Sequence, residues 1–375
     1  MKLFEYEAKR ILKGYGIPVP RGDIAHSPDE AEAVARDIGR PVALKSQVLV
    51  SGRGKSGGIL FADDANEAKR TASSLIGRTI KGSKVGSLLV EEKLDIVEQF
   101  YASVTIDRQA KTYIVLASTS GGVDIEEVAQ NSADKISRCW VDPTVGFSTA
   151  DAMGMLSRFN MNNDDAIKFA SVISTLYEVT MDYDAELVEV NPLAKTATGE
   201  LVAADARLII DDNALFRHPE FKDKSTQRED DTPREAEARK EKIAYVDLYG
   251  DIGIIGNGAG LVLATIDLVQ LFGGRPANFL DMGGGAQTEI IKRGFALVMS
   301  KPEVRAVFVN MLGGITRCDL VAQGIIEGLK ECKVRKPVVV RMMGLNEEEG
   351  ARMLREAGIN TYSNMEEAVV QVLKL

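Results

Sequence analysis

Three side chains that offer oxygen ligands, Glu189, Asn191 and Asp205, lie in a stretch with the pattern of a β-hairpin. Two runs rich in β-branched residues flank a turn at residues 197–199. Gly199 supplies the left-handed backbone that a three-residue hairpin loop needs. With this turn, Asn191 faces Asp205 directly across the ladder, and Glu189 lies two residues away on the same face.

The chemistry of this set is metal binding. Mg²⁺ takes one or two protein oxygens and completes its octahedron with phosphate and water. The predicted hairpin brings two or three such oxygens together on rigid backbone. The alternative is a solvated hairpin face, and the other motifs of the chain favour the metal.

A lysine and a glycine-rich loop supply positive charge and backbone donors earlier in the chain. Lys45 is the one charge in an apolar strand predicted at Pro41–Val50, where a lysine is costly unless it is paired. Gly52, Arg53 and Gly54 belong to the following loop, SGRGKSGG, which leads into a second strand and fits neither the dinucleotide nor the Walker A pattern. Such a loop is a flap that covers nucleotide phosphates. The alternatives are a plain hairpin and a Lys45 that lies on a wet edge or pairs with a structural carboxylate.

The C-terminal part alternates strands and helices from residue 253 to residue 373, which predicts a doubly wound parallel sheet. Its first three strands end in glycine-rich loops at residues 256–260, 281–285 and 310–316. Ligands of open α/β sheets bind at this edge, where N–H groups at helix starts suit a phosphoryl group or a carboxylate. An NAD site in the first loop is the alternative. Its GxGxG spacing and the two further glycine loops argue against NAD.

A charged segment, His218–Lys242, has almost no apolar residues and predicts a domain boundary. We expect an N-terminal domain at 1–225, with a smaller lobe at about 20–100, and a C-terminal domain at 244–375. The linker between them, 226–243, ends in a solvated helix after Thr232-Pro233. The alternative is a charged surface excursion within a single domain.

Composition excludes several classes of function. The chain has 375 residues and a net charge of −9, which argues against nucleic acid or an anionic membrane as its main partner. No run approaches the roughly 20 apolar residues of a membrane helix. Three widely spaced cysteines predict neither a disulfide framework nor a zinc site, and the N-terminus lacks a signal-peptide pattern. We therefore expect a cytoplasmic protein.

Together these motifs resemble the β subunit of succinate–CoA ligase (succinyl-CoA synthetase), nearly end to end. The resemblance is carried by LFEYEAKRIL with GIPVP, SGRGKSGG, LVEVNPL, DDNALFR, NGAGL, PANFLDMGGGA and GGITRCD. It implies an N-terminal ATP-grasp domain and a C-terminal flavodoxin-like CoA-ligase domain. It also implies the reversible joining of succinate and CoA at the expense of a nucleoside triphosphate, through succinyl-phosphate and a phosphohistidine, in the tricarboxylic acid cycle. That histidine belongs to an α subunit, so an αβ or α2β2 assembly is expected.

The resemblance also assigns roles by position. One Mg²⁺ per β subunit, bound together with ATP/ADP or GTP/GDP, is implied at Asn191 and Asp205, with Glu189 near the phosphohistidine. Gln99 stands where the family often has a nucleotide-contacting Glu, so that contact has lost its charge. The implied contacts to nucleotide phosphates, base and ribose are Lys45, Gly52, Arg53, Gly54, Glu91 and the backbone at Leu94. The implied contacts to succinate and the phosphoryl group at the α/β interface are Asn257, Gly314, Ile315 and Thr316.

Alternative functions remain open at this point. A close alternative is the β subunit of another acid–CoA ligase of the same superfamily, such as a malate–CoA ligase. A non-catalytic nucleotide-binding subunit is a second alternative, and the presence of Lys45, Asn191 and Asp205 speaks against it. A self-sufficient ATP-grasp ligase is disfavoured because no local nucleophile is visible.

Overall fold

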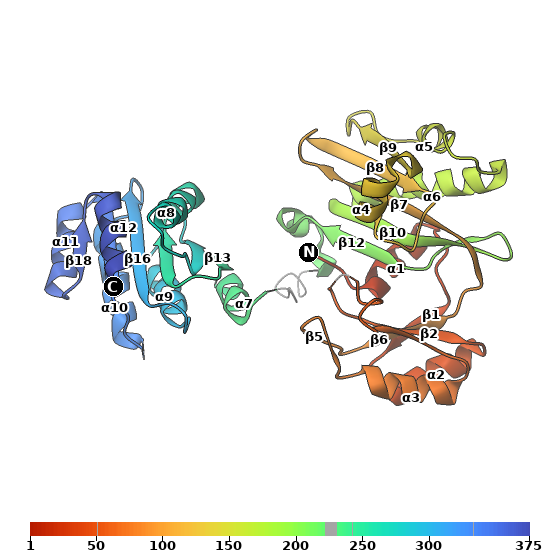
Figure 1. Ribbon diagram of the computed structural model, residues 1–375, viewed down its shortest axis with the longest axis horizontal. Coiled ribbons are helices and arrows are strands. Elements are labelled where there is room, and N and C mark those ends of the chain that lie inside the picture. The colour runs from red at the N-terminus through yellow and green to blue at the C-terminus, as the bar shows by residue number, and fades with distance from the viewer. Residues whose placement is uncertain (51, 222–230, 242, 333) are drawn as a thin grey trace. The chain divides into compact units, whose positions relative to one another are not determined.

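The computed structural model describes residues 1–50, 52–221, 231–241, 243–332 and 334–375. Contacts divide the chain into two compact units, Met1–Asp230 and Asp231–Leu375 (Figure 1). The predicted linker at 226–243 spans this division, and its residues 226–230 and 242 lie outside the described part. The helix predicted after Thr232-Pro233 is present as α7 (Pro233–Lys240), which packs within the second unit.

The smaller lobe of the first unit is a four-stranded antiparallel sheet covered by two helices on one face. Its strands, in sheet order, are β1 (Gly22–Ala25), β6 (Leu88–Glu92), β2 (Val42–Ser46) and β3 (Ile59–Ala62). The helices are α2 (Pro28–Ile38) and α3 (Ala65–Leu75), and a small hairpin adds β4 (Thr79–Ile80) and β5 (Ser83–Lys84). Val42 and Leu44 pack beneath the helices. Because side chains alternate along a strand, Lys45 points to the opposite face.

The strand predicted at Pro41–Val50 is shorter than expected. β2 ends at Ser46, whose N–H donates to Gly58, and the next N–H, that of Gln47, donates to Ser87. Residues 48–50 leave the ladder and lead into the glycine-rich loop. Their apolar character reflects burial of Val48 and Leu49 rather than strand pairing.

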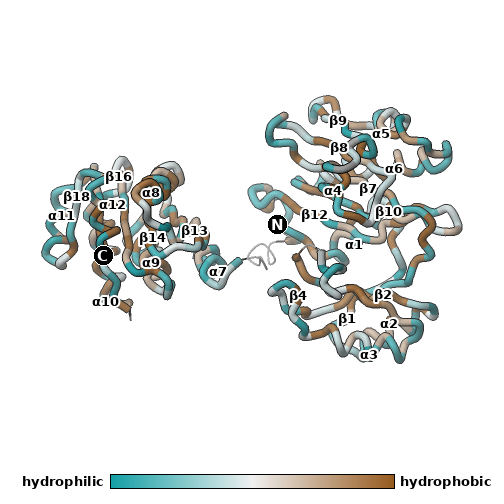
Figure 2. The backbone as a smooth tube through the Cα atoms, viewed as in Figure 1, coloured by the Kyte–Doolittle hydropathy of each residue, from teal (hydrophilic) through white to brown (hydrophobic). Residues whose placement is uncertain are grey.

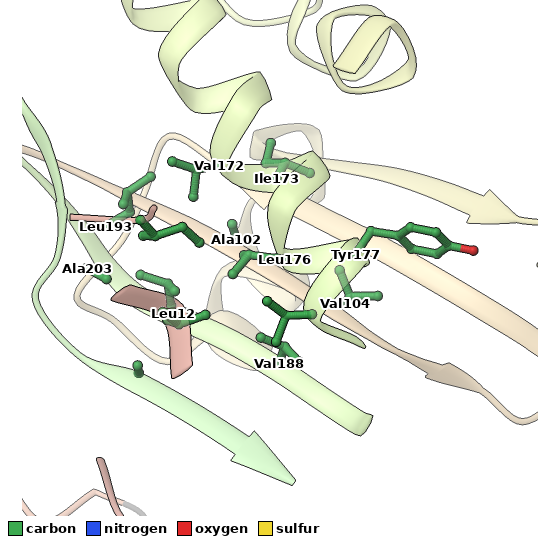
Figure 3. Close-up of a cluster of buried hydrophobic side chains, with 14 of the residues drawn as sticks. Leu12, Ala102, Val104, Val172, Ile173, Leu176, Tyr177, Val188, Leu193 and Ala203 are labelled. Carbon is green, nitrogen blue, oxygen red and sulfur yellow. The ribbon is translucent and has the colours of Figure 1, made fainter. Parts of the chain in front are cut away.

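The larger lobe of the first unit is a six-stranded antiparallel sheet. Its strands are β11 (Leu201–Ala203), β10 (Ala185–Thr196), β7 (Ile96–Asp107), β8 (Thr112–Ser118) and β9 (Ile136–Val141) in sheet order, with β12 (Ala206–Ile210) also paired to β10. The helices of this lobe are α4 (Ile125–Asn131), α5 (Thr149–Leu156) and α6 (Asn163–Asp182). Figure 3 shows side chains of α6 clustered with those of the sheet, among them Leu176, Val104 and Val188.

Helix α1 (Glu5–Gly14) does not include the first four residues of the chain. The first residues instead pair with β12: the N–H of Leu3 donates to Leu208, and the N–H of Ile210 donates to Met1. This pairing holds α1 against the larger sheet. Its charged face, with Glu5 and Lys9, consequently reaches the boundary between the two lobes, where both side chains are buried.

The second unit confirms the predicted doubly wound sheet. Its strands, in sheet order, are β13 (Ala244–Asp247), β15 (Asn278–Asp281), β14 (Ile252–Gly256), β16 (Ala306–Gly313), β17 (Val338–Gly344) and β18 (Asn360–Tyr362). All pair in parallel except β13, an antiparallel edge strand that was not predicted. Figure 2 shows β14 and β16 as mainly hydrophobic and α7 as hydrophilic.

Helices cover both faces of this sheet. The core on one face includes α8 (Ala259–Leu271) and α12 (Met365–Lys374), and the core on the other includes α9 (Thr288–Met299), α10 (Cys318–Glu331) and α11 (Glu347–Glu356). Because β15 and β16 flank β14 on opposite sides, the chain reverses its direction across the sheet there, and the ends of these three strands form a topological switch point. Among the described residues, no helix combines the length and apolar character that a membrane crossing requires.

Candidate functional site

A cavity of about 400 Å³ in the first unit is bordered by the glycine-rich loop, the start of α1 and the strand pair β10–β12. Six of the residues singled out from the sequence line it: Gly52, Arg53, Gly54, Glu189, Asn191 and Asp205. Residues 122–126, which run from the loop after β8 into the first turn of α4, close another side. The flap and the hairpin, which are far apart in the sequence, therefore face one space.

The hairpin has the predicted register. The N–H of Asn191 donates to the carbonyl of Asp205 at 3.3 Å, and the N–H of Thr196 donates to Glu200 at 2.9 Å. Gly199 has the left-handed φ of +78° that the turn requires. One continuous register thus runs through β11 and β12 and aligns the two oxygen-bearing side chains on neighbouring strands.

Both of these side chains already have protein partners. Asn191 Oδ1 accepts from the N–H of Gly122 at 2.7 Å, and its Nδ2 donates to the carbonyl of Val123 at 3.0 Å. One Asp205 oxygen accepts from its neighbour's N–H at 2.8 Å and from Arg53 Nη2 at 3.3 Å. Burial and the nearby Glu5 carboxylate raise the pKa of Asp205, while Arg53 opposes them.

This donor set fits Mg²⁺. One carboxylate and one amide oxygen at the edge of a cavity leave the remaining positions to phosphate and water, which is the usual pattern for this ion. In the described part of the chain, no three His, Cys, Asp or Glu side chains gather as a metal cage. A metal between Asn191 and Asp205 would therefore depend on a phosphate ligand for most of its coordination.

Lys45 is buried and fully paired. Its Nζ lies 2.9 Å from Glu5 Oε1 and 2.6 Å from Glu91 Oε1, and it also donates to the carbonyl of Ala204. Burial lowers the pKa of Lys45, but the carboxylates of Glu5 and Glu91 raise it by more. The pairing that the sequence left open as an alternative is present.

The network extends beyond Lys45. Lys9 of α1 contacts Glu5 at 2.8 Å, Glu91 at 2.7 Å and the carbonyl of Ala204 at 2.7 Å. Three cations and three carboxylates form one connected set: Lys9, Lys45, Arg53, Glu5, Glu91 and Asp205. All of them except Asp205 are buried, and buried charges are tolerated only when paired, so these five depend on one another.

Arg53 connects this network to the flap. Its Nη1 donates to the carbonyl of Ser46 at 2.9 Å, and its Nη2 pairs with Glu5 and reaches Asp205. Arg53 also lines the cavity, unlike Lys45. The guanidinium thus joins the loop, α1 and the hairpin, with its remaining N–H groups available to an anion.

Glu189 lines the same cavity and has a partner from β7. The hydroxyl of the buried Tyr101 donates to Glu189 Oε2 at 3.1 Å. Burial raises the pKa of Glu189, and Tyr101 and Arg207 lower it by less. Arg207 stands opposite Glu189 in the ladder, and its buried Nε has no hydrogen-bond partner among the described residues.

Four residues assigned to the nucleotide by resemblance do not border the described cavity: Lys45, Glu91, Leu94 and Gln99. Glu91 belongs to the buried network, and Leu94 follows β6 half-buried. Gln99 is exposed on β7, and its carbonyl accepts from the N–H of Gly121 at 2.9 Å. It therefore contacts the loop that holds Asn191, and its role in nucleotide binding stays a prediction.

Sequence reasoning missed Glu5, Lys9, Tyr101 and Arg207. Glu5 and Lys9 are four residues apart on one helix, which is a recognisable ion-pair spacing. Glu5 and Lys9 pair with Lys45 and Glu91, which lie on other elements. The sequence around the helix does not predict these contacts. Tyr101 and Arg207 lie on β7 and β12, and their positions beside Glu189 depend on how these strands pair with β10.

In the second unit, the three predicted glycine loops meet. Asn257 connects the first loop to the third: its Oδ1 accepts from the N–H of Leu312 at 2.9 Å, and its Nδ2 donates to the carbonyl of the same residue at 2.7 Å. Thr316 connects the third loop to the second, since its Oγ1 accepts from the N–H of Gly285 at 2.8 Å. Asp281 accepts from the N–H groups of Gly258 and Gly283.

The assigned substrate residues of this unit lie at this edge with different exposure. Thr316 is buried, whereas Ile315 is 81% exposed. Asn257 Nδ2 lies 3.5 Å from Thr316 Oγ1. Gly314 is also exposed, and its N–H donates to the carbonyl of Leu312 at 3.1 Å.

Comparison with known proteins was decisive for the family. The ATP-grasp domain family matches residues 2–195, and the CoA-ligase family matches residues 255–374. The succinate–CoA ligase [ADP-forming] subunit β of Desulfurococcus amylolyticus is 48% identical, over 100% of this chain and 99% of its own. The chain belongs to the succinate–CoA ligase β-subunit family.

Further comparisons agree with this membership. A relative from Thermus thermophilus, a succinate–CoA ligase [GDP-forming] subunit β, is 44% identical over 100% of this chain and 99% of its own. A solved ATP citrate lyase from Methanothrix soehngenii has a TM-score of 0.76 at 19% identity, covering 100% of this chain and 99% of that one, which shows a shared fold. The chain is thus a ligase subunit with a nucleotide substrate and an α partner.

Proposed function

We propose that the first unit binds a Mg²⁺–nucleotide in the cavity between flap and hairpin, and that the second unit presents succinate and the phosphoryl group to the α subunit. The observation that carries this is the alignment of Asn191 with Asp205 beside Arg53 and the glycine loop. Oxygen ligands, a guanidinium and backbone N–H groups around one cavity are the components that bind nucleotide phosphates.

In this proposal, the residues of the chain hold the nucleotide phosphates in position and neutralise their charge, and none of them is a nucleophile. Bound Mg²⁺ would neutralise phosphate oxygens and hold them in line. Arg53 has N–H groups that make no hydrogen bond to the described residues, and Gly52 and Gly54 of the flap line the same space. Glu189, held by Tyr101, stands at the cavity wall, where its carboxylate can accept a hydrogen bond from an imidazole N–H.

The reactive imidazole in this proposal comes from the α subunit. The chain has two histidines, and neither borders the described cavity. In the second unit, Asn257 and Thr316 hold the loop that carries Gly314 and Ile315. Exposed backbone N–H groups of a loop that follows a strand suit a carboxylate or a phosphoryl group at a subunit interface.

Profiling of acids and nucleotides tests the proposal. The purified chain is combined with its α subunit and supplied with CoA, Mg²⁺, ATP or GTP, and a series of acids that includes succinate and malate. We expect succinyl-CoA as the main product, with the nucleoside diphosphate and phosphate in equal amounts. The absence of product from every dicarboxylate with both nucleotides would contradict the proposal.

The same preparation addresses the finer expectations. A higher kcat/KM with malate than with succinate would favour the other acid–CoA ligase. The ratio of ATP to GTP turnover gives the nucleotide preference, on which the two relatives differ. Light scattering distinguishes an αβ from an α2β2 assembly. A location in the cytoplasm and a role in the tricarboxylic acid cycle belong to the same proposal.

A further inference from the structure

The ammonium of Lys45 has no N–H left for a ligand. A lysine has three donors, and all three face protein acceptors here: Glu5, Glu91 and the carbonyl of Ala204. A phosphate oxygen can therefore contact Lys45 only by replacing one of these acceptors. Which acceptor is replaced therefore affects the free energy of nucleotide binding.

Glu5 is the acceptor that stands between Lys45 and the cavity. Among the described residues, Glu5 borders the cavity, whereas Glu91, Ala204 and Lys45 itself do not. The two oxygens of Glu5 serve different cations, since Oε1 lies 2.9 Å from Lys45 Nζ and Oε2 pairs with Arg53. One carboxylate thus bridges the lysine and the arginine, as a phosphate with two oxygens would.

Resting on the nucleotide site proposed above, we infer that Glu5 occupies the place of a nucleotide phosphate and sets nucleotide affinity by competing for Lys45 and Arg53. The competition is direct, because both ligands are anions and share the same donors. Glu5 keeps the two cations aligned and charge-neutral when no nucleotide is present. On binding, phosphate oxygens take over these contacts.

The network contains a partner for the displaced carboxylate. Lys9 lies 2.8 Å from Glu5 Oε1 and sits on the same helix. When Lys45 and Arg53 turn to phosphate, Glu5 retains this cation and avoids becoming an unpaired buried charge. The exchange therefore requires local side-chain movement only, and α1 can stay in place on the larger sheet.

Calorimetric titration of the αβ complex with MgADP tests the inference on the Glu5→Gln variant. The amide keeps the size of the side chain but loses the charge that competes with phosphate. We expect the variant to bind MgADP roughly tenfold more tightly than the wild type, the factor that corresponds to loss of one competing charge-assisted contact. A structural role alone would loosen Lys45 and Arg53 and weaken binding.

Glu7→Gln is the matched control. Glu7 lies on the same helix and is buried, and it accepts hydrogen bonds from the N–H of Phe4 and the hydroxyl of Tyr6 but does not border the described cavity. We expect the MgADP dissociation constant of this variant to stay within about twofold of the wild-type value. An equal gain in both variants would mean that general charge, and not Glu5, sets affinity, and would overturn the inference.

The remaining outcomes are also decisive. Unchanged or weaker MgADP binding by Glu5→Gln overturns the inference but leaves the nucleotide site intact, whereas a wild-type complex that does not bind MgADP overturns the site and the inference together. If the Glu5→Gln complex does not fold, Glu5→Asp replaces it. This shorter carboxylate keeps its charge but cannot bridge both cations, so tighter MgADP binding supports the inference and any other result refutes it.

Discussion

The two sites of this chain are built from different groups. The cavity of the first unit is surrounded by formal charges, with Arg53, Glu5 and Asp205 joined in one network. The loop edge of the second unit uses backbone N–H groups, one amide and one hydroxyl, and among the described residues Asp281 there accepts only from backbone. The first arrangement suits a highly charged ligand that brings its own cation, and the second suits a small anion.

The difference also concerns distance along the chain. In the first unit, Glu5 and Lys45 pair across 40 residues of sequence, and Arg53 and Asp205 pair across 152 residues. The loops of the second unit each follow their own strand and meet because parallel strands end at one edge. A site of paired charges therefore depends on tertiary packing, whereas a loop site follows from topology.

The largest expected effect is that of Asp205→Ala. Loss of the carboxylate removes one of the two proposed metal ligands, and we expect kcat/KM to fall on the order of 100-fold or more, as for other lost electrostatic contacts to a transferring group. The Asp205 side chain is 39% exposed, so circular dichroism should show an intact fold. Asp164→Ala, an exposed aspartate on α6 that pairs with Lys168, is the control. Unchanged activity of Asp205→Ala at saturating Mg²⁺ would show that charge at this hairpin is dispensable.

The next largest effect is expected in the second unit from Asn257→Ala. This change removes both hydrogen bonds to Leu312 and frees the third loop, so we expect the KM for the acid to rise roughly tenfold. Initial rates over a range of acid concentrations measure it. Asn257→Asp keeps the acceptor and loses the donor, and should lie between the wild type and Asn257→Ala. An unaltered KM for the acid in Asn257→Ala would show that this loop does not contribute to acid binding.

Much of the fold and part of the site could be predicted from the sequence. The register that places Asn191 opposite Asp205 follows from Gly199 and strict alternation, which are local properties. The loop edge of the second unit follows from its alternation of strands and helices. Contacts of Glu5 with Lys45 and Arg53 could not be predicted, because a charged residue on an amphipathic helix normally faces solvent. The hydrogen bonds of Asn191 with Gly122 and Val123 likewise depend on tertiary packing.

The second unit also contains a buried charge pair, which lies away from its glycine-rich loops. Asp247 lies 2.8 Å from Lys301, and although burial opposes it, this bond and those from Thr232 and Tyr245 lower the pKa of Asp247 to about 2. A carboxyl group whose pKa is lowered on folding stabilises the protein at pH values above its pKa in the unfolded chain. This stabilisation is lost as the pH falls through about 2. We expect Asp247→Asn to reduce the free energy of unfolding by roughly 2 kcal/mol at pH 7.

Urea unfolding of the chain at several pH values measures this effect. The difference between the wild type and Asp247→Asn should shrink as the pH is lowered from 4 toward 2. Ligase activity of the folded variant should stay close to that of the wild type, since the pair lies outside the loop edge. A large loss of activity in fully folded protein would mean that charge also serves function in this unit.

The smallest expected effect concerns Glu189, whose pKa is raised. A carboxyl group whose pKa is raised on folding stabilises the folded state at pH values below its pKa in the unfolded chain. This stabilisation is lost as the pH rises through its pKa in the folded protein. Glu189→Gln should therefore increase the melting temperature slightly at pH 7, with no gain at pH 4. Scanning calorimetry at both values tests this. A lower melting temperature at pH 7 would indicate that Tyr101 and Arg207 outweigh burial.

The central claim is that two facing strands of the first unit hold the metal that accompanies the nucleotide. Mn²⁺ takes the same oxygen ligands as Mg²⁺ and can be located by its anomalous scattering in crystals of the αβ complex grown with ADP. The account predicts an anomalous peak within bonding distance of Asn191 Oδ1 and the Asp205 carboxylate, with the loop at Gly122 moved off the amide. A peak at other side chains, in crystals where ADP is present, would contradict it.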